Sequence, residues 1–231
     1  MTPPGTPGGR GQPPDRSPFA GTNLHVGGHP VRVHDPATVP PGVAILLHDG
    51  DAGTHPADLT ALGVTVVEVL ESAHFWMTPA GEAWVSETLA PWALARWGVP
   101  HVALVGFGVA GHAALRLTFR AAGLFPVVAA ESAAVDLHDY YGTGTPLDGV
   151  YDSREACRQD SALLSVRQSR TPPHVAFACP PPHAHSRGND RLREKLNAIG
   201  VAHTFVEQPE ATAALAGFVA AGLRQHARRL L

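Results

Sequence analysis

The sequence predicts a three-layer α/β/α sandwich, in which helices cover both faces of a mostly parallel, twisted sheet and an antiparallel hairpin precedes it. Short apolar runs of the kind that is buried on both faces recur along the chain. These runs are residues 43–48, 64–69, 101–106, 126–130, 174–179 and 203–206. Helical stretches alternate with them, the clearest at 81–97, 109–122, 189–199 and 211–230. Such alternation favours a parallel sheet whose ligands bind at the carboxyl ends of the strands.

Turn and breaker residues add three further predictions: an N-terminal hairpin, an interrupted helix and a disordered tail. Residues 24–26 and 31–33 predict a short hairpin joined through Gly27 and Gly28. Pro91 predicts a kink or a split in the first long helix, because proline has no amide hydrogen to donate. Residues 1–20 are rich in proline and glycine, which predicts a disordered tail and leaves 21–231 as a single domain.

Composition excludes several classes of partner. The chain has 231 residues, a net charge of −3 and only 16% charged residues, so no basic excess indicates nucleic acid. No apolar stretch approaches the ~18 residues that a membrane span needs. The start lacks the pattern of a secretory signal, so we expect a cytoplasmic protein. Cys157 and Cys179 are too few for a disulfide framework or a zinc site. We expect no metal and no cofactor, whereas a small-molecule ligand or a protein partner stays open.

The most informative passage is a strand that runs through a tight glycine turn straight into a helix. Gly106, Gly108 and Gly111 match the dinucleotide-binding pattern G-x-G-x-x-G, and Glu131 lies twenty residues beyond the last of them. The same turn also matches the nucleophile elbow G-x-S-x-G, with Gly108 at the serine position and Ala110 at the second glycine position. Position favours the elbow, because core strands and a long helix precede the turn.

Several stretches resemble the esterase D-like branch of the α/β-hydrolase superfamily. They are residues 46–51, 104–116, 125–136, 141–148, 152–164 and 187–200, and the resemblance covers about residues 40–230. It implies a sheet of the α/β-hydrolase type. It also implies ester hydrolysis in which a serine attacks, a histidine moves the proton and an acid orients the histidine.

The chain departs from this family at all three catalytic positions. Gly108 has no hydroxyl, the acid loop reads Pro-Pro-His, and the histidine loop after the last strand is missing. The vestigial positions are Gly108, Pro181, Pro182, His183, Glu210 and Ala211. Loss of the nucleophile alone costs on the order of 10⁶ in turnover. The sequence therefore predicts a non-catalytic homologue.

A small pocket is expected to survive at the elbow. Backbone N–H groups of Val109 and of the loop after the first core strand are predicted to form an anion- or carbonyl-binding cavity. Asp49 would oppose an anion if its carboxylate points inward. The pocket candidates are His48, Asp49, Gly50, Asp51, Phe107, Val109, His112 and His183.

Two alternatives stay open beside the non-catalytic role. The first is an active acyl hydrolase that uses Ser132 or Cys179 as a displaced nucleophile, or a metal. The metal ligands would be His48, Asp51, His183 and His185, although their spacing matches no established pattern. The second is dinucleotide binding at the glycine turn. The segment from Tyr140 to Tyr151 is interpreted as either a lid over the pocket or a surface loop.

Overall fold

A computed structural model describes residues 21–37, 42–50, 55–167, 171–208 and 210–228, so the predicted N-terminal tail lies outside the described part. These residues form one sheet in the order β1-β2-β4-β3-β5-β6-β7-β8. The strands are β1 (Thr22–Val26), β2 (His29–His34), β3 (Val43–Leu47), β4 (Thr65–Val69), β5 (Val102–Phe107), β6 (Val127–Glu131), β7 (His174–Ala178) and β8 (Thr204–Val206). The pairs β1–β2 and β2–β4 are antiparallel and all others are parallel, which confirms the predicted sheet with its N-terminal hairpin.

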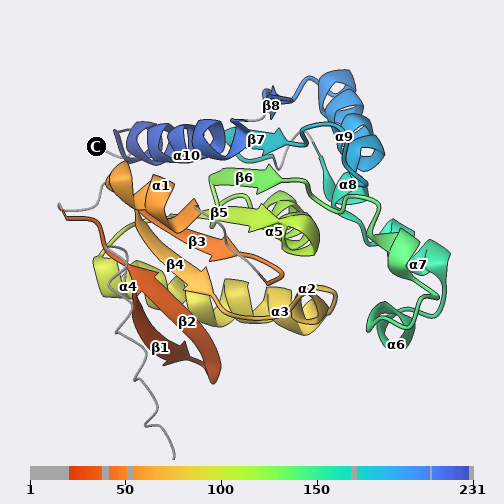
Figure 1. Ribbon diagram of the computed structural model, residues 1–231, viewed down its shortest axis with the longest axis horizontal. Helices are drawn as coiled ribbons and strands as arrows, with labels where there is room; N and C mark the ends of the chain where they lie inside the picture. The colour runs from red at the N-terminus through yellow and green to blue at the C-terminus, as the bar shows by residue number, and fades with distance from the viewer. Residues whose placement is uncertain (1–20, 38–41, 51–54, 168–170, 209, 229–231) are drawn as a thin grey trace, which may run out of the picture.

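Helices cover both faces of this sheet (Figure 1). They are α1 (His55–Ala61), α2 (Ala73–Trp76), α3 (Pro79–Trp84), α4 (Ala90–Trp97), α5 (Gly108–Arg120), α6 (Leu147–Val150), α7 (Arg154–Gln159), α8 (Ala162–Ser165), α9 (Ser186–Ala198) and α10 (Ala211–Arg228). A π-helical segment η1 (Val85–Leu89) and a 3₁₀ segment η2 (Leu137–Tyr140) complete the order. Helices α1 and α10 pack on one face, and α3, η1, α4, α5 and α9 pack on the other. None of the described helices is both long and apolar enough to cross a membrane.

The predicted interruption near Pro91 is confirmed, and it lies just before the proline. Helix α3 passes into the π-helical segment η1, and Pro91 then sits in the first turn of α4. A widened turn accommodates a residue that cannot donate a hydrogen bond and whose ring crowds the preceding carbonyl. The helix ends at Gly98, whose φ of 63° provides the left-handed C-terminal cap.

A buried arginine ties the segment 141–160 to the body of the fold. The side chain of Arg116, on α5, is only 1% exposed and pairs with Glu82 on α3. Nη1 of Arg116 donates to the Tyr151 hydroxyl at 3.1 Å and lies 3.2 Å from Asp160 Oδ2. Removing one member of a buried pair leaves an uncompensated charge, which costs about 3–5 kcal/mol.

We therefore expect Arg116→Met to lower the free energy of unfolding by about 3–5 kcal/mol, measured by urea denaturation. Arg154→Met is the matched control, because Arg154 pairs with Asp139 on the surface, where both side chains are more than half exposed. Such pairs contribute about 0–1 kcal/mol. Equal losses in the two variants would contradict the anchoring role of Arg116.

Buried histidines make the stability depend on pH. Burial lowers the pKa of His112 well below 6.5, and the charge of Arg116 lowers it further. Burial and the neighbouring His226 and His174 lower the pKa of His101. The unfolded chain therefore binds more protons than the folded chain below about pH 6.5, so stability must fall as the pH falls through that range.

We expect the free energy of unfolding to decrease between about pH 7.5 and 5.5, with a smaller decrease in His101→Gln. The pKa of Glu68 is lowered to about 2, so the stability that its charged form contributes is lost only at lower pH, below the ordinary value of 4.5. Urea titrations across the pH range measure both effects. A free energy that rises on acidification through pH 6.5 would contradict the assignment.

Candidate functional site

The turn from β5 to α5 has the geometry of a nucleophile elbow without a side chain at its tip. Gly108 begins α5 directly after the strand and has a φ of +54°, in the left-handed region that favours glycine. A Cβ on Gly106 would lie 2.7 Å from the Ala110 carbonyl oxygen and 2.8 Å from the Gly111 Cα. A Cβ on Gly108 would overlap Oδ2 of Asp49. The small residues are therefore required by the close approach of the strand and the helix.

The carboxylate of Asp49 occupies the place where an elbow serine would project. Its Oδ2 accepts a hydrogen bond from the Val109 backbone N–H at 3.2 Å. Helix α5 has no acidic residue in its own first turn, so Asp49 supplies the negative charge that a helix N-terminus attracts. The Asp49 carboxylate points toward the elbow, the option that the sequence left open, although the residue as a whole is exposed. The N–H that was predicted to bind an anion is therefore bound by the chain itself.

A buried network holds the residue before Asp49. Nε2 of His48 lies 3.3 Å from Oε1 of Glu68, and the His48 backbone oxygen accepts from Trp76 Nε1 at 2.8 Å. The other oxygen of Glu68 pairs with His34 Nε2 at 2.7 Å. Burial alone would raise the pKa of Glu68, but hydrogen bonds with His34 and His48 lower it to about 2. The imidazole of His48 thus points into the protein and fixes the end of β3.

The other predicted pocket residues lie in several different environments. His112 is fully buried, and its Nε2 accepts from the Ala162 N–H at 3.0 Å, so its ring fastens α8 rather than facing a ligand. The ring of Phe107 stacks on His55 with 3.7 Å between centroids. Gly50 is exposed beside Asp49, and Asp51 lies outside the described residues.

Glu131, which the dinucleotide pattern would place on a ribose, already has partners for one of its carboxylate oxygens. Its Oε2 accepts from Thr212 Oγ1 at 3.0 Å, and His55 Nε2 lies 3.8 Å away. Burial raises the pKa of Glu131. The position at which the resemblance implied a histidine is next to this contact: Ala211 is buried at the start of α10, and Glu210 is exposed.

The two displaced-nucleophile candidates follow β6 and β7. Ser132 has a φ of 49°, unusual for a residue with a side chain, and its N–H donates to the Ala178 carbonyl at 2.7 Å. Sγ of Cys179 lies 3.8 Å from the Ser186 hydroxyl. Burial raises the pKa of Cys179, so this thiol is not activated as a thiolate.

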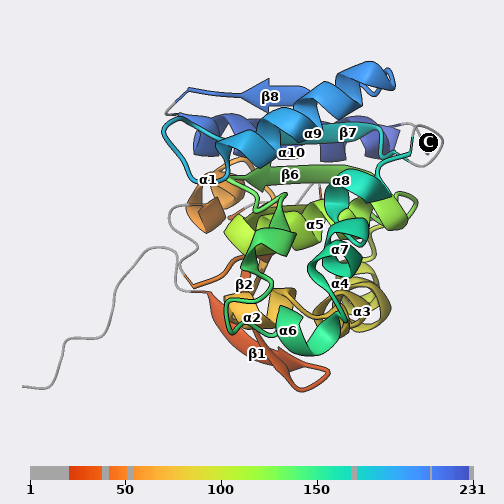
Figure 2. The same cartoon turned by 90° about the vertical axis from the view of Figure 1, so that its right-hand side faces the viewer.

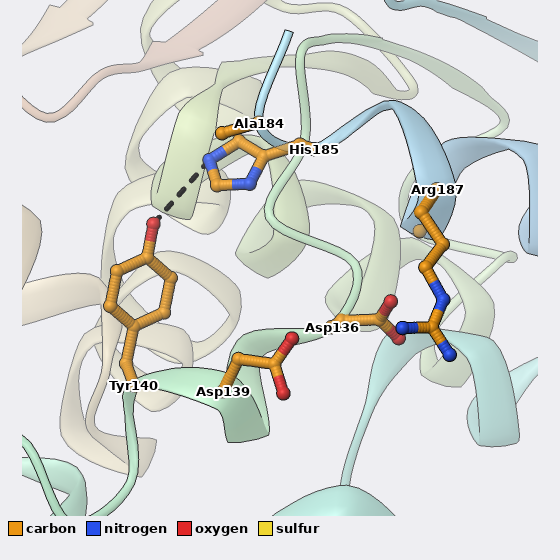
Figure 3. A pocket seen from close by; sticks show the side chains of 7 residues that line it. Asp136, Asp139, Tyr140, Ala184, His185 and Arg187 are labelled. Carbon is orange, nitrogen blue, oxygen red and sulfur yellow. Dashed lines mark hydrogen bonds between the residues drawn. The ribbon is translucent and has the colours of Figure 1, made fainter.

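A pocket of about 330 Å³ opens between the loops that follow β6 and β7 (Figure 3). It is lined by Asp136, Asp139, Tyr140, Ala184, His185, Arg187 and Gly188. Tyr140 and His185 lie together, with 3.5 Å between the hydroxyl oxygen and Nε2. Burial raises the pKa of Tyr140, and the negative charges of Asp49 and Asp139 raise it further. Burial and His183 lower the pKa of His185, whereas Asp49 opposes that shift. The pocket therefore adjoins the elbow.

The residues after β7 that were expected at the acid position, 181–183, do not reach this pocket, whereas the residues that come directly after them do. Pro181, Pro182 and His183 are exposed, whereas His185 lines the cavity. Within the described residues, no group of three or more His, Cys, Asp or Glu side chains is arranged to hold a metal ion. His48 and the His183–His185 loop are not brought together, because Glu68 holds His48 elsewhere.

The segment 141–160, which contains α6 and α7, projects at the edge of the molecule (Figures 1 and 2). The backbone N–H groups of Gly142 and Gly144 donate to the Asp148 carboxylate at 2.6 and 2.9 Å. Tyr151 binds Asp160 at 2.6 Å and so joins the Arg116 network. Only its neighbour Tyr140 reaches the pocket. The sequence marked Tyr140 only as the start of a lid or a surface loop and did not mark Asp136, because the loops after β6 and β7 meet only in three dimensions.

The fold and the elbow together define the class: the chain has the fold of the α/β-hydrolases. No protein-family model matches the chain, and no curated protein matches it. The S-formylglutathione hydrolase of Agrobacterium tumefaciens is similar with a TM-score of 0.67 and 15% identity, over 94% of this chain and 98% of that one. The fluorophosphonate-binding serine hydrolase F of Staphylococcus aureus has a TM-score of 0.65 and 13% identity, over 86% and 96%. A ferulic acid esterase has a TM-score of 0.63 and 16% identity, over 85% and 92%.

The geometry of the elbow predicts that Gly108 and Asp49 are energetically coupled. Gly108→Ala forces a side chain into a left-handed backbone, at about 1–2 kcal/mol. It also displaces the Asp49 carboxylate and removes the Val109 hydrogen bond, a loss comparable to that of a helix cap, about 1 kcal/mol. In an Asp49→Ala background only the backbone strain remains, so Gly108→Ala should cost about 1 kcal/mol less there.

Urea denaturation of the two single variants and the double variant measures this coupling. Gly142→Ala is the control for backbone strain alone, because Gly142 has a φ of +82° and open space around its missing Cβ. Strictly additive effects of Gly108→Ala and Asp49→Ala would mean that the carboxylate does not occupy the place of the side chain.

Proposed function

We propose that this protein is a non-catalytic homologue of the esterase D-like serine hydrolases, and that it binds a small ligand in the pocket beside the elbow. The observation that carries the proposal is the Asp49 carboxylate at the tip of the elbow. It lies where a serine would project, and it accepts from the backbone N–H of Val109, the second residue of α5.

Ester hydrolysis at this site lacks what the chemistry needs. An attacking oxygen requires a base to take its proton, and the developing oxyanion requires backbone donors. Gly108 has no hydroxyl, and the carboxylate of Asp49 is bound to one of the expected donors. A second negative charge that develops on the substrate beside that carboxylate is destabilised rather than stabilised.

The alternatives receive less support from the same residues. The raised pKa of Cys179 disfavours it as a nucleophile, and Ser132 follows a strand that leads into no long helix. For a dinucleotide, the pyrophosphate would meet the Asp49 carboxylate at the N-terminus of α5. The ribose would have to compete with Thr212 for Glu131.

We expect the purified protein to show no labelling by a serine-directed fluorophosphonate and no turnover of short acyl esters of p-nitrophenol. An active serine esterase assayed in parallel is the positive control. Stoichiometric labelling or turnover that Ser132→Ala or Cys179→Ala abolishes would overturn the proposal in favour of a displaced nucleophile. Thermal stabilisation by NAD would favour the dinucleotide alternative, because a ligand at a hundred times its Kd adds ~2.7 kcal/mol.

A further inference from the structure

The pocket beside the elbow is lined by acidic and basic side chains, and they differ in whether they have a partner of opposite charge. Oδ1 of Asp136 lies 2.6 Å from Arg191, and Oδ1 of Asp139 pairs with Arg154. Neither arginine lines the cavity. The charge of Asp136 is therefore neutralised by a partner outside the cavity. The pair of Asp139 with Arg154 is more than half exposed, so water screens it and Asp139 keeps part of its negative charge at the cavity wall.

Arg187 is different from these paired charges. It lines the cavity, and within the described part of the chain no carboxylate oxygen lies within 4.0 Å of its guanidinium nitrogens. Its guanidinium presents five donors in a planar fork that matches a carboxylate. In Figure 3 this group lies at one side of the pocket, and Tyr140 with His185 lies at the other.

The Tyr140 side of the pocket is electrically negative. Asp139 lines it, and the charge of the Asp49 carboxylate, which accepts from the Val109 N–H, opposes the lowering of the pKa of His185. That lowering, which burial causes first, keeps the imidazole neutral near pH 7. The hydroxyl oxygen of Tyr140 and the carboxylate of Asp139 are both acceptors, and an ammonium group is a donor of three hydrogen bonds.

The volume limits the size of what fits. Ligand pockets range from about 300 to 1,000 Å³, and this one, at about 330 Å³, lies at the small end. A ligand that satisfies both sides must therefore carry its two opposite charges within one short molecule.

Resting on the binding role proposed above, we propose that this pocket takes a small zwitterion of the amino-acid type. Its carboxylate lies against Arg187, and its ammonium group lies against Asp139 and the Tyr140 hydroxyl.

The test uses the full chain and the standard L-amino acids at millimolar concentration as probes, with thermal shift followed by calorimetric titration. At least one amino acid should bind. Its decarboxylated amine and its deaminated carboxylic acid should each bind at least ~tenfold more weakly, which corresponds to ~1.4 kcal/mol.

Variants separate the two ends of the ligand. Arg187→Gln should weaken binding of the amino acid and of the acid about tenfold or more, and leave binding of the amine unchanged. Asp139→Asn should weaken the amino acid and the amine, and leave the acid unchanged. Arg158→Gln is the control, because Arg158 pairs with Glu155 on the surface and does not line the pocket.

Three results would overturn the inference: no amino acid binds, the amine or the acid binds as tightly as the zwitterion, or Arg187→Gln has no more effect than Arg158→Gln. None of these results depends on hydrolysis, so the two proposals can fail separately. If no amino acid binds and no ester is turned over, the zwitterion proposal is wrong and the non-catalytic role is unaffected. If esters are turned over and an amino acid still binds, only the non-catalytic role is wrong.

Discussion

The close approach of β5 and α5 is the constraint on which the rest of the site depends. Gly106 and Gly111 let the strand turn into the helix within one residue, and Gly108 supplies the left-handed backbone at the tip. In the α/β-hydrolase fold this turn presents a side chain to the substrate. In this chain the residue at the tip is a glycine, and packing between the strand and the helix requires the small residues on either side of it.

A helix N-terminus has backbone N–H groups without partners inside the helix, and the loop after β3 supplies an acceptor for one of them in α5. Asp49 accepts from Val109, and the residue before it is fixed by Glu68 and Trp76. The glycine at the tip and the carboxylate beside it are therefore two parts of one arrangement. The missing side chain of Gly108 leaves room for the carboxylate, so the N-terminus of α5 already has a negative charge beside it.

The fold could be predicted from the sequence almost element by element, because short apolar runs buried on both faces and long amphipathic helices carry local signals. The core strands begin and end within a residue or two of the expected bounds. The site was less predictable. Gly108 and the inward option for Asp49 were visible, whereas His48 and His112 were expected at the pocket and are bound by Glu68 and the Ala162 N–H. Residue type and loop position cannot show which way a side chain turns.

The residues that line the pocket were also not predictable from local sequence signals. Its lining comes from η2 and from the start of α9, two segments that are separated by more than forty residues and carry no shared motif. Arg116 brings them to the same region only indirectly, because it holds the segment 141–160 on α5 while β6 and β7 fix the loops at their carboxyl ends. A sheet that positions loops in this way holds a cavity at the carboxyl ends of its strands. The residues that line this cavity come from those loops, and none of them comes from the turn between β5 and α5.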